Sequence, residues 1–167
     1  QLGSGQAVLC AKKCFREFSG DILILSGDVT LISERTLNGA IHWHRQHNAA
    51  LTLITVSLQE PKGYGRVLRQ SDSEITGIVE EGDATEAQRQ ITEVNAGIYV
   101  VSAPFLFSAL EKVQNHNEQG EYYLPDIVAV ALRQGKQVAT VKVDDAREVM
   151  GINTREELAK MEKALQE

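Results

Sequence analysis

The sequence predicts an α/β fold, with a mainly parallel sheet, helices around it and one inserted antiparallel β-hairpin. Two short and almost wholly apolar runs, 21–27 and 51–58, have the length and composition of strands buried on both faces. Segments with apolar residues at helical spacing alternate with these runs, as in sheets built from parallel strands. Between 65 and 81 the period changes to strict alternation, which is typical of a hairpin.

The first half of the chain begins with a predicted helix. Its buried face carries four apolar residues at helical spacing, Val8, Ala11, Phe15 and Phe18. After the strand at 21–27, a helix from about Glu34 to His47 is expected, with Ser33 as its N-cap. Because a doubly wound sheet normally opens with a strand and a glycine-rich turn, the chain is expected to be the later part of a domain.

The second half contains the hairpin and six further predicted elements. The hairpin strands, 65–70 and 74–81, are joined by a Ser-Asp-Ser turn. Then follow a short helix within 83–90, a strand at 94–101, helices at 104–113 and 124–134, a strand at 137–143 and a final amphipathic helix. Thr154 and Glu157 form a capping box at the start of that last helix. The hairpin is expected to form one wall of a sugar or nucleotide pocket.

Composition limits the classes of partner. A chain of 167 residues is long enough for one domain with a hydrophobic core. The net charge of −6 and the absence of any Lys/Arg cluster argue against nucleic acid. Because no apolar run approaches the roughly 18 residues of a membrane span, no membrane partner is expected. Cys10 and Cys14 are interpreted as reduced, half-buried residues of a cytoplasmic protein.

Two residues are candidate metal ligands. Asp28 follows the apolar strand at 21–27, at the end where open α/β sheets bind ligands, and Gly27 beside it has no Cβ to obstruct a ligand. Asp28 is therefore either a ligand for a metal at a phosphate site or a cap of the next turn. Asn153 stands just before the final helix, where its amide oxygen suits a hard cation. Its alternative role is that of a simple turn residue.

Other polar residues lie where predicted elements meet. The segment 1–5, Gln-Leu-Gly-Ser-Gly, precedes the first helix, where N–H groups can face an anion or a base carbonyl, or where the residues serve only as caps. Two glycines surround Tyr64 at the start of the hairpin, which allows either a close ligand approach or a structural turn. Glu80 ends the second hairpin strand, and Asn95 lies in the strand-like segment that follows.

Taken together, these motifs resemble the pyrophosphorylase domain, an N-acetylglucosamine-1-phosphate uridylyltransferase, of a family of bacterial bifunctional enzymes. The resemblance covers nearly the whole chain in order and rests on seven motifs at 1–5, 26–28, 63–66, 78–80, 93–98, 120–126 and 151–153. It implies a Rossmann-like nucleotide-diphospho-sugar transferase fold. It also implies transfer of uridylyl from UTP to N-acetylglucosamine 1-phosphate, which gives UDP-N-acetylglucosamine for peptidoglycan and lipopolysaccharide synthesis.

The resemblance also implies roles for particular residues. Asp28 and Asn153 would be the catalytic pair that shares Mg²⁺. The other residues would bind substrate, with Gln1, Gly3 and Ser4 near the uracil and nucleotide, Ser26 and Gly27 beside the metal ligand, and Gly65, Glu80 and Asn95 around the sugar. This sequence departs from the family at Ser26, where an aromatic residue is frequent, and at Pro125, where threonine is common.

Further parts of the family's enzymes are expected to lie outside this chain. The resemblance places a glycine-rich loop and a lysine, which neutralise the triphosphate, before Gln1. It places a β-helix acetyltransferase domain, through which the complete enzyme would form a homotrimer, after the last helix. The chain alone is therefore expected to be inactive. Two alternatives remain: a nucleotidyltransferase for another sugar 1-phosphate, and a catalytically silent module that only binds sugar nucleotides.

Overall fold

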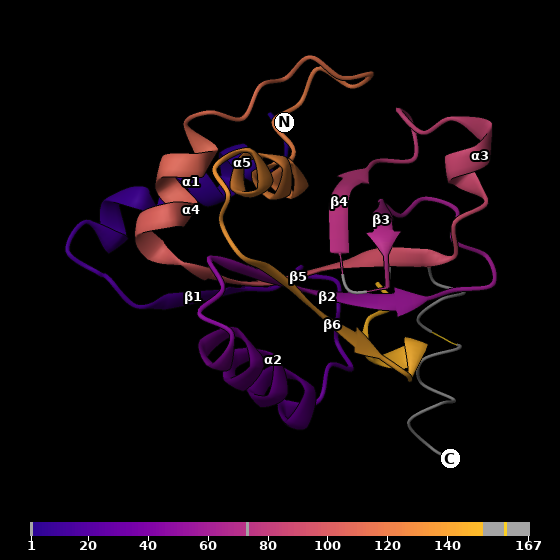
Figure 1. Cartoon of the computed structure of the whole chain (residues 1–167), viewed down its shortest axis with the longest axis horizontal. Helices are drawn as coiled ribbons and strands as arrows, with labels where there is room; N and C mark the ends of the chain where they lie inside the picture. The colour runs from indigo at the N-terminus through magenta and orange to yellow at the C-terminus, as the bar shows by residue number, and fades with distance from the viewer. Residues whose placement is uncertain (1, 73, 152–158, 160–167) are drawn as a thin grey trace.

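The computed structural model describes residues 2–72, 74–151 and 159, which form a six-stranded mixed sheet with helices on both faces (Figure 1). The strands are β1 (Asp21–Ile24), β2 (Leu51–Ser57), β3 (Arg66–Ser71), β4 (Glu74–Val79), β5 (Glu93–Ser102) and β6 (Val138–Val143). Their order is β4-β3-β5-β2-β6. The remaining strand, β1, pairs with the second half of β5. It lies along the same edge of β5 as β3, which pairs with the first half, whereas β2 pairs along the opposite edge.

The mixed α/β fold is confirmed, but the expectation of a mainly parallel sheet is wrong. Among the described strands the parallel ladder is that between β2 and β6. Strand β5 lies between β1 and β2 and runs antiparallel to both. A buried apolar run shows that a strand is covered on both faces, but it does not show the direction of its neighbours.

Helices cover both faces of the sheet. Their bounds are α1 (Ser4–Cys10), α2 (Glu34–Gln46), α3 (Glu86–Arg89), α4 (Ala103–Leu110) and α5 (Ile127–Arg133), with 3₁₀ turns η1 (Ala11–Phe15), η2 (Leu124–Asp126) and η3 (Ala146–Glu148). Figure 1 shows α2 below the sheet and α1, α4 and α5 above it. None of the described helices is long and apolar enough to cross a membrane.

Two cores follow from the alternation of side chains along the central strands. On β2, Leu51 and Leu53 pack into the core beneath α4 and α5, whereas Ile54 and Val56 pack into the core on the side of α2. Successive residues of a strand point to opposite faces, so one strand supplies both cores. On α2, the Ser33 Oγ accepts a hydrogen bond from the Thr36 N–H at 3.1 Å, which confirms Ser33 as the N-cap.

The first strand differs from its prediction. It ends at Ile24, and all four of its residues are half-buried, because β1 is an edge strand that pairs only with β5 among the described residues. Phe18 is 46% exposed rather than buried. Both cysteines are exposed as well as free, so their predicted half-burial is wrong. The final helix and its capping box at Thr154 and Glu157 lie outside the described residues.

Candidate active site

Two adjoining cavities contain most of the predicted site residues. The first, the Tyr64 cavity, has a volume of about 910 Å³ and is lined by Asp28, Tyr64, Gly65 and Gly151, among others. The second, the Tyr123 cavity, measures about 720 Å³ and is lined by Ser4, Tyr99 and Tyr123, among others. The two cavities share the residues Ser26, Gly63, Glu80, Asn95 and Gly97. The structure thus brings together side chains from several distant segments.

A bulge in β5 shapes the wall between the cavities. Leu53 pairs with Tyr99 and Thr55 with Asn95, so β5 contains two more residues than β2 over this interval. Gly97 lies inside the bulge with φ of 72°, a conformation that other residues rarely adopt. The Ser26 Oγ donates to the Gly97 carbonyl at 3.2 Å, which ties the segment after β1 to the bulge. Bulges of this kind redirect side chains next to functional sites.

The bulge fixes the orientation of the Asn95 amide. Its Oδ1 accepts from the Gly97 N–H at 3.2 Å, and its Nδ2 donates to the Tyr99 hydroxyl at 2.6 Å. Burial raises the pKa of Tyr99, so its hydroxyl remains protonated. An amide can form more hydrogen bonds than these two, and Asn95 lines both cavities. Asn95 is therefore oriented by the protein and still able to bind a polar ligand.

Glu80 and Gly65 pack against each other at the hairpin. A Cβ placed on Gly65 would lie 2.8 Å from the Glu80 Oε1, so a larger residue would displace this carboxyl group. The Gly65 carbonyl accepts from the Asn95 N–H at 2.9 Å, which connects the same glycine to β5. Burial raises the pKa of Glu80, and the charges of Asp126 and Asp83 raise it further, whereas Arg66 opposes the shift.

Asp28 is half-buried in the wall of the Tyr64 cavity, beside a segment from the far end of the chain. Val29 forms an antiparallel bridge with Gly151. An added Cβ on Gly27 would meet nothing within 4 Å, so the backbone before Asp28 is open to a ligand. Asn153 lies outside the described residues, as does Gln1.

The segment at the start of the chain forms hydrogen bonds with residues 122–124. The Gly5 N–H donates to the Tyr122 carbonyl at 2.8 Å, and the Ser4 Oγ accepts from the Leu124 N–H at 3.0 Å. A Cβ on Gly3 would lie 2.6 Å from the Tyr122 carbonyl oxygen. The expectation that glycine N–H groups here face a ligand is therefore wrong for Gly5. Ser4 nevertheless lines the Tyr123 cavity.

Sequence reasoning did not assign Gly97, Tyr99 or Tyr123 to the site. The signal for Gly97 was a glycine inside a strand pattern, which often marks a bulge. No comparable signal separates Tyr99 from an ordinary core tyrosine, because its role depends on a hydrogen bond to Asn95 across the bulge. Tyr123 follows a polar loop, and only the fold shows that it lines the same cavity as Glu80 and Ser4.

Comparison with known proteins identifies the class of domain to which this fold and these cavities belong. Residues 1–149 match the family described as nucleotidyl transferase, and the chain belongs to this family. Curated relatives include the bifunctional protein GlmU of Syntrophotalea carbinolica, 50% identical over 159 residues, and that of Acetivibrio thermocellus, 40% identical over 159 residues. In both comparisons the match covers 95% of this chain and 34% of the relative, so the chain spans about a third of their length. The resemblance to the pyrophosphorylase domain of such bifunctional enzymes is confirmed.

Solved structures agree on the fold. A UDP-glucose pyrophosphorylase complexed with UDP-glucose has a TM-score of 0.71 at 13% identity, over 99% of this chain and 63% of that one. The structure of a Bacillus anthracis protein in complex with sucrose has a TM-score of 0.73 at 15% identity. The match covers 99% of this chain and 61% of the Bacillus anthracis chain. The nucleotide-diphospho-sugar transferase fold is thereby confirmed.

Proposed function

We propose that this chain is the sugar-binding part of an enzyme that transfers uridylyl from UTP to N-acetylglucosamine 1-phosphate, releasing pyrophosphate. The observation that supports this most strongly is the convergence of Asp28, Gly65, Glu80 and Asn95 on one cavity. By the family resemblance, Asp28 would bind the metal, and the other three residues would bind the sugar. Curated relatives at 40–50% identity are bifunctional GlmU proteins, which also supports the proposal.

The sugar is proposed to bind between Glu80 and Asn95 in the Tyr64 cavity. Asn95 is held by its hydrogen bonds to Gly97 and Tyr99, and the Glu80 carboxyl group lies against Gly65, where a Cβ would not fit. A site built to hydrogen-bond a polar group of its substrate discriminates against analogues that lack that group, because the buried partner is then left unpaired. This would provide selectivity for the substituent at the sugar C2.

A magnesium ion is proposed to bind to Asp28 and Asn153. Among the described residues no group of three or more His, Cys, Asp or Glu could hold a metal. Mg²⁺ needs fewer protein ligands, because it keeps several waters and binds substrate phosphates. Asp28 fits such a site, since its half-buried carboxylate lines the cavity, and Gly151, two residues before Asn153, is paired with Val29. When bound, the ion would neutralise charge on the two phosphate groups.

The reaction itself would ask little covalent chemistry of the protein. A phosphate oxygen of the sugar phosphate attacks the α-phosphorus of UTP in line, a new P–O bond forms, and the bond to pyrophosphate breaks. Glu80 and Asn95 would hold the sugar so that its phosphate lies at the attacking position. Such positioning supplies much of the rate in reactions of this class.

The test uses the product of the full-length gene with UTP, N-acetylglucosamine 1-phosphate and Mg²⁺, with pyrophosphate release as the measurement. We expect turnover, and a loss of at least about a hundredfold in Asp28→Asn because a charged ligand is removed. The matched control is Asp144→Asn, an exposed acid that lines neither the Tyr64 nor the Tyr123 cavity. Preference for another sugar 1-phosphate would instead indicate a nucleotidyltransferase for that sugar. Binding of UDP-N-acetylglucosamine without turnover would indicate a catalytically silent module that only binds sugar nucleotides.

A further inference from the structure

Arg66 is a buried cation that contacts three separate segments near the Tyr64 cavity. Its side chain is only 2% exposed. Its guanidinium donates to the Glu81 Oε2 at 2.7 Å, to the Tyr64 carbonyl, and to the Arg89 carbonyl at 3.4 Å. Arg66 therefore connects the start of β3 to the turn after β4 and to the end of α3.

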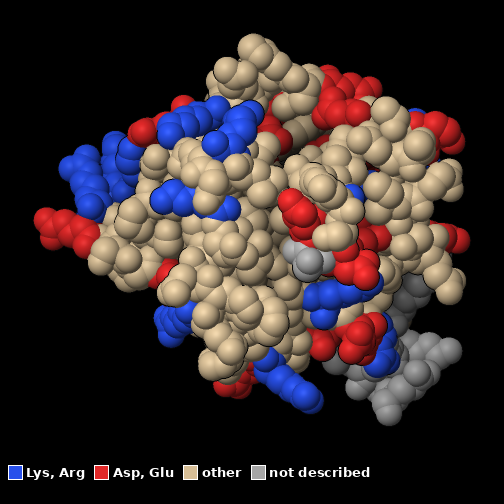
Figure 2. Space-filling view, in the orientation of Figure 1, with Lys and Arg blue, Asp and Glu red and all other residues tan. Residues whose placement is uncertain are grey.

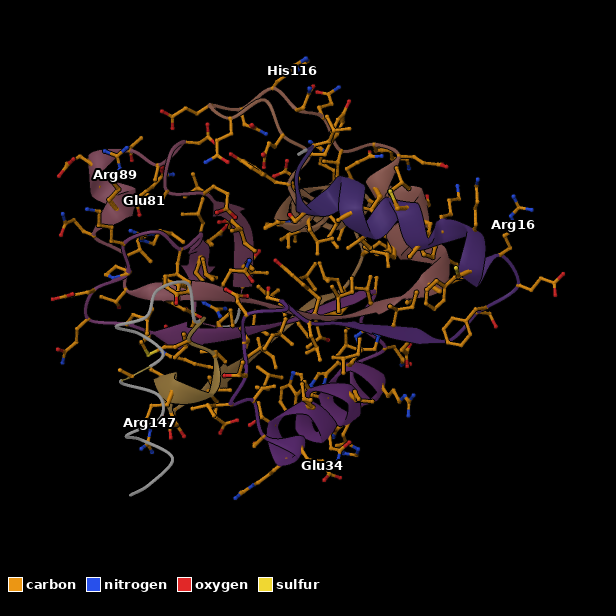
Figure 3. The ribbon with its side chains drawn as sticks, turned by 180° about the vertical axis from the view of Figure 1, so that it is seen from behind. Arg16, Glu34, Glu81, Arg89, His116 and Arg147 are labelled. Carbon is orange, nitrogen blue, oxygen red and sulfur yellow. The ribbon has the colours of Figure 1, made fainter. Side chains whose placement is uncertain are left out.

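Glu81 completes the connection to the loop that precedes β3. Its Oε2 accepts from the Gly63 N–H at 3.2 Å as well as from Arg66. The hydrogen bond from Arg66 lowers the pKa of Glu81, so the carboxyl group stays charged. Figure 3 shows Glu81 next to Arg89, the last residue of α3, and the Arg89 Nε lies 3.9 Å from the Glu81 Oε1. Arg66 and Glu81 thus hold residues 63 and 64 by their backbone atoms.

The loop 61–65 held in this way is part of the cavity wall. Gly63, Tyr64 and Gly65 all line the Tyr64 cavity. Gly65 lies directly against Glu80, and its carbonyl accepts from the Asn95 N–H. A shift of the loop would therefore change the spacing between the backbone and the two side chains proposed to hold the sugar. Arg66 itself does not line the cavity and would act through this loop.

The cost of keeping this cation buried argues for a role beyond stability. The Arg66 Nε is buried and has no hydrogen-bond partner among the described residues. Replacing a buried ion pair by well-packed apolar residues is often neutral or stabilising, so a buried, incompletely satisfied arginine is weak evidence for a stabilising function. An unsatisfied buried group calls for an explanation, such as a bound water or a role at a functional site.

We propose that Arg66 is a positioning residue which, with Glu81, holds the loop 61–65 as the wall of the sugar phosphate site and so sets the affinity for the sugar phosphate. The identity of that ligand rests on the proposed function above. The guanidinium suits this task because its planar set of donors reaches a carboxylate and two carbonyls at once, which the single ammonium of lysine does not reproduce.

The test compares Arg66→Lys and Glu81→Gln with Arg69→Lys in the full-length protein. Arg69 is the matched control, because it is also an arginine of β3 that forms an ion pair. Its guanidinium donates to both Glu93 carboxylate oxygens at 2.7 Å. Arg69 lines neither the Tyr64 nor the Tyr123 cavity. We expect Arg66→Lys to raise the KM for the sugar phosphate about tenfold and to leave the KM for UTP within about twofold. Glu81→Gln should give a smaller change of the same kind, and Arg69→Lys should leave both KM values unchanged.

A second measurement does not depend on the substrate. Amide hydrogen exchange should be faster at 63–65 in Arg66→Lys than in the unmodified protein, and unchanged there in Arg69→Lys. An unchanged sugar phosphate KM in an active Arg66→Lys enzyme, or equal increases for both substrates, would overturn the proposal. If the unmodified protein does not turn over UTP and N-acetylglucosamine 1-phosphate, the proposed function fails. Faster exchange would then still support the role of Arg66, and unchanged exchange would refute it.

Discussion

Gly97 combines two constraints that act on a single residue. Its φ of 72° strains any side chain with a Cβ, and a Cβ there would also lie 2.5 Å from the Ser26 Oγ. A rotation of Ser26 could relieve the contact but would break its hydrogen bond to the Gly97 carbonyl. Strain and contact therefore add at this position, and both act on the bulge that orients Asn95.

We predict that Gly97→Ala destabilises the protein by about 1–3 kcal/mol, because a residue held in a sparsely populated backbone region costs that much. Gly77→Ala in β4 is the control, since a Cβ there meets nothing within 4 Å, and it should change stability by less than about 0.5 kcal/mol. Urea denaturation measures both. Equal free energies of unfolding for the two variants would show that the bulge does not require glycine.

The half-buried carboxyl group of Glu80 should make the stability of the protein depend on pH. Burial raises its pKa above the ordinary value of about 4.5, and Asp126 and Asp83 contribute in the same direction. A carboxyl group whose pKa is higher in the folded than in the unfolded state contributes stability that is full below the unfolded pKa. That contribution is lost as the pH rises through the folded pKa.

We therefore predict that the stability of the unmodified protein relative to Glu80→Gln falls as the pH rises above about 4.5. Glu74→Gln, which removes an exposed carboxyl group at the start of β4, is the matched control for the loss of one negative charge. The free energy of unfolding in urea, measured at a series of pH values, gives the comparison. A difference between the two proteins that is constant with pH would contradict the raised pKa of Glu80.

At the scale of elements, α2 holds the segment that approaches Asp28. The Glu148 Oε2 accepts from the Ser33 N–H at 3.1 Å and from the Thr36 Oγ1 at 2.6 Å, at the N-terminus of α2. Burial alone would raise the pKa of Glu148, but the hydrogen bonds from Thr36 and Ser33 lower it overall. Three residues further on, Gly151 pairs with Val29. The contact with α2 therefore places the chain beside the proposed metal site.

We predict that Glu148→Ala raises the Mg²⁺ concentration needed for half-maximal activity by about tenfold, because residues that orient metal ligands typically affect affinity to this extent. Glu34→Ala is the control, because Glu34 is an acid in the first turn of α2 that, among the described residues, does not contact the segment around Gly151. Its hydrogen bond among the described residues is with Asn38, at 3.3 Å. Figure 3 shows Glu34 at this helix. A Mg²⁺ titration with the same midpoint in both variants would contradict the role of Glu148.

Local signals predicted the elements well, and long-range pairing explains what they could not predict. Ser33 marked the start of α2, and alternation marked β3 and β4, because caps and periodicity are local properties. The direction of β5 and its bulge depend on pairing with β1 and β2, which no local pattern encodes. For the site, family motifs named Asp28, Glu80 and Asn95, and the structure shows that these three residues line one cavity. The buried contacts of Tyr99 and Arg66 could be found only in the structure.

At the scale of the whole molecule, charge is unevenly distributed. Figure 2 shows Lys and Arg gathered over the end that carries α1 and η1, where Lys12 and Lys13 lie, and Asp and Glu over the half that carries α3 and the hairpin. No Lys or Arg is among the described residues that line the Tyr123 cavity, which instead includes Glu80, Glu81 and Glu121. Burial raises the pKa of Tyr123, and nearby carboxylates raise it further. A phosphate group in this cavity would therefore meet carboxylates and no Lys or Arg among the described residues, whereas Lys62 and Arg147 line the Tyr64 cavity.

The last prediction follows from this imbalance. We predict that the 167-residue chain, produced alone, releases pyrophosphate from UTP and N-acetylglucosamine 1-phosphate at least about a hundredfold more slowly than the full-length gene product. Removing even one group that stabilises transition-state charge typically has that effect. The family resemblance places the groups that neutralise the triphosphate before Gln1, and the Tyr123 cavity offers no Lys or Arg among its described residues to replace them.

Pyrophosphate release by the two proteins is compared at equal concentration and saturating Mg²⁺. Circular dichroism and a cooperative thermal transition of the chain are the control, because only a folded chain tests the chemistry. Introducing one basic residue into the Tyr123 cavity, as in Gln119→Lys, should not raise the rate of the chain to that of the full-length protein. A single flexible ammonium lacks the fixed geometry of a phosphate-binding loop. Comparable rates for a folded chain and the full-length protein would show that the described cavities already hold a complete catalytic site.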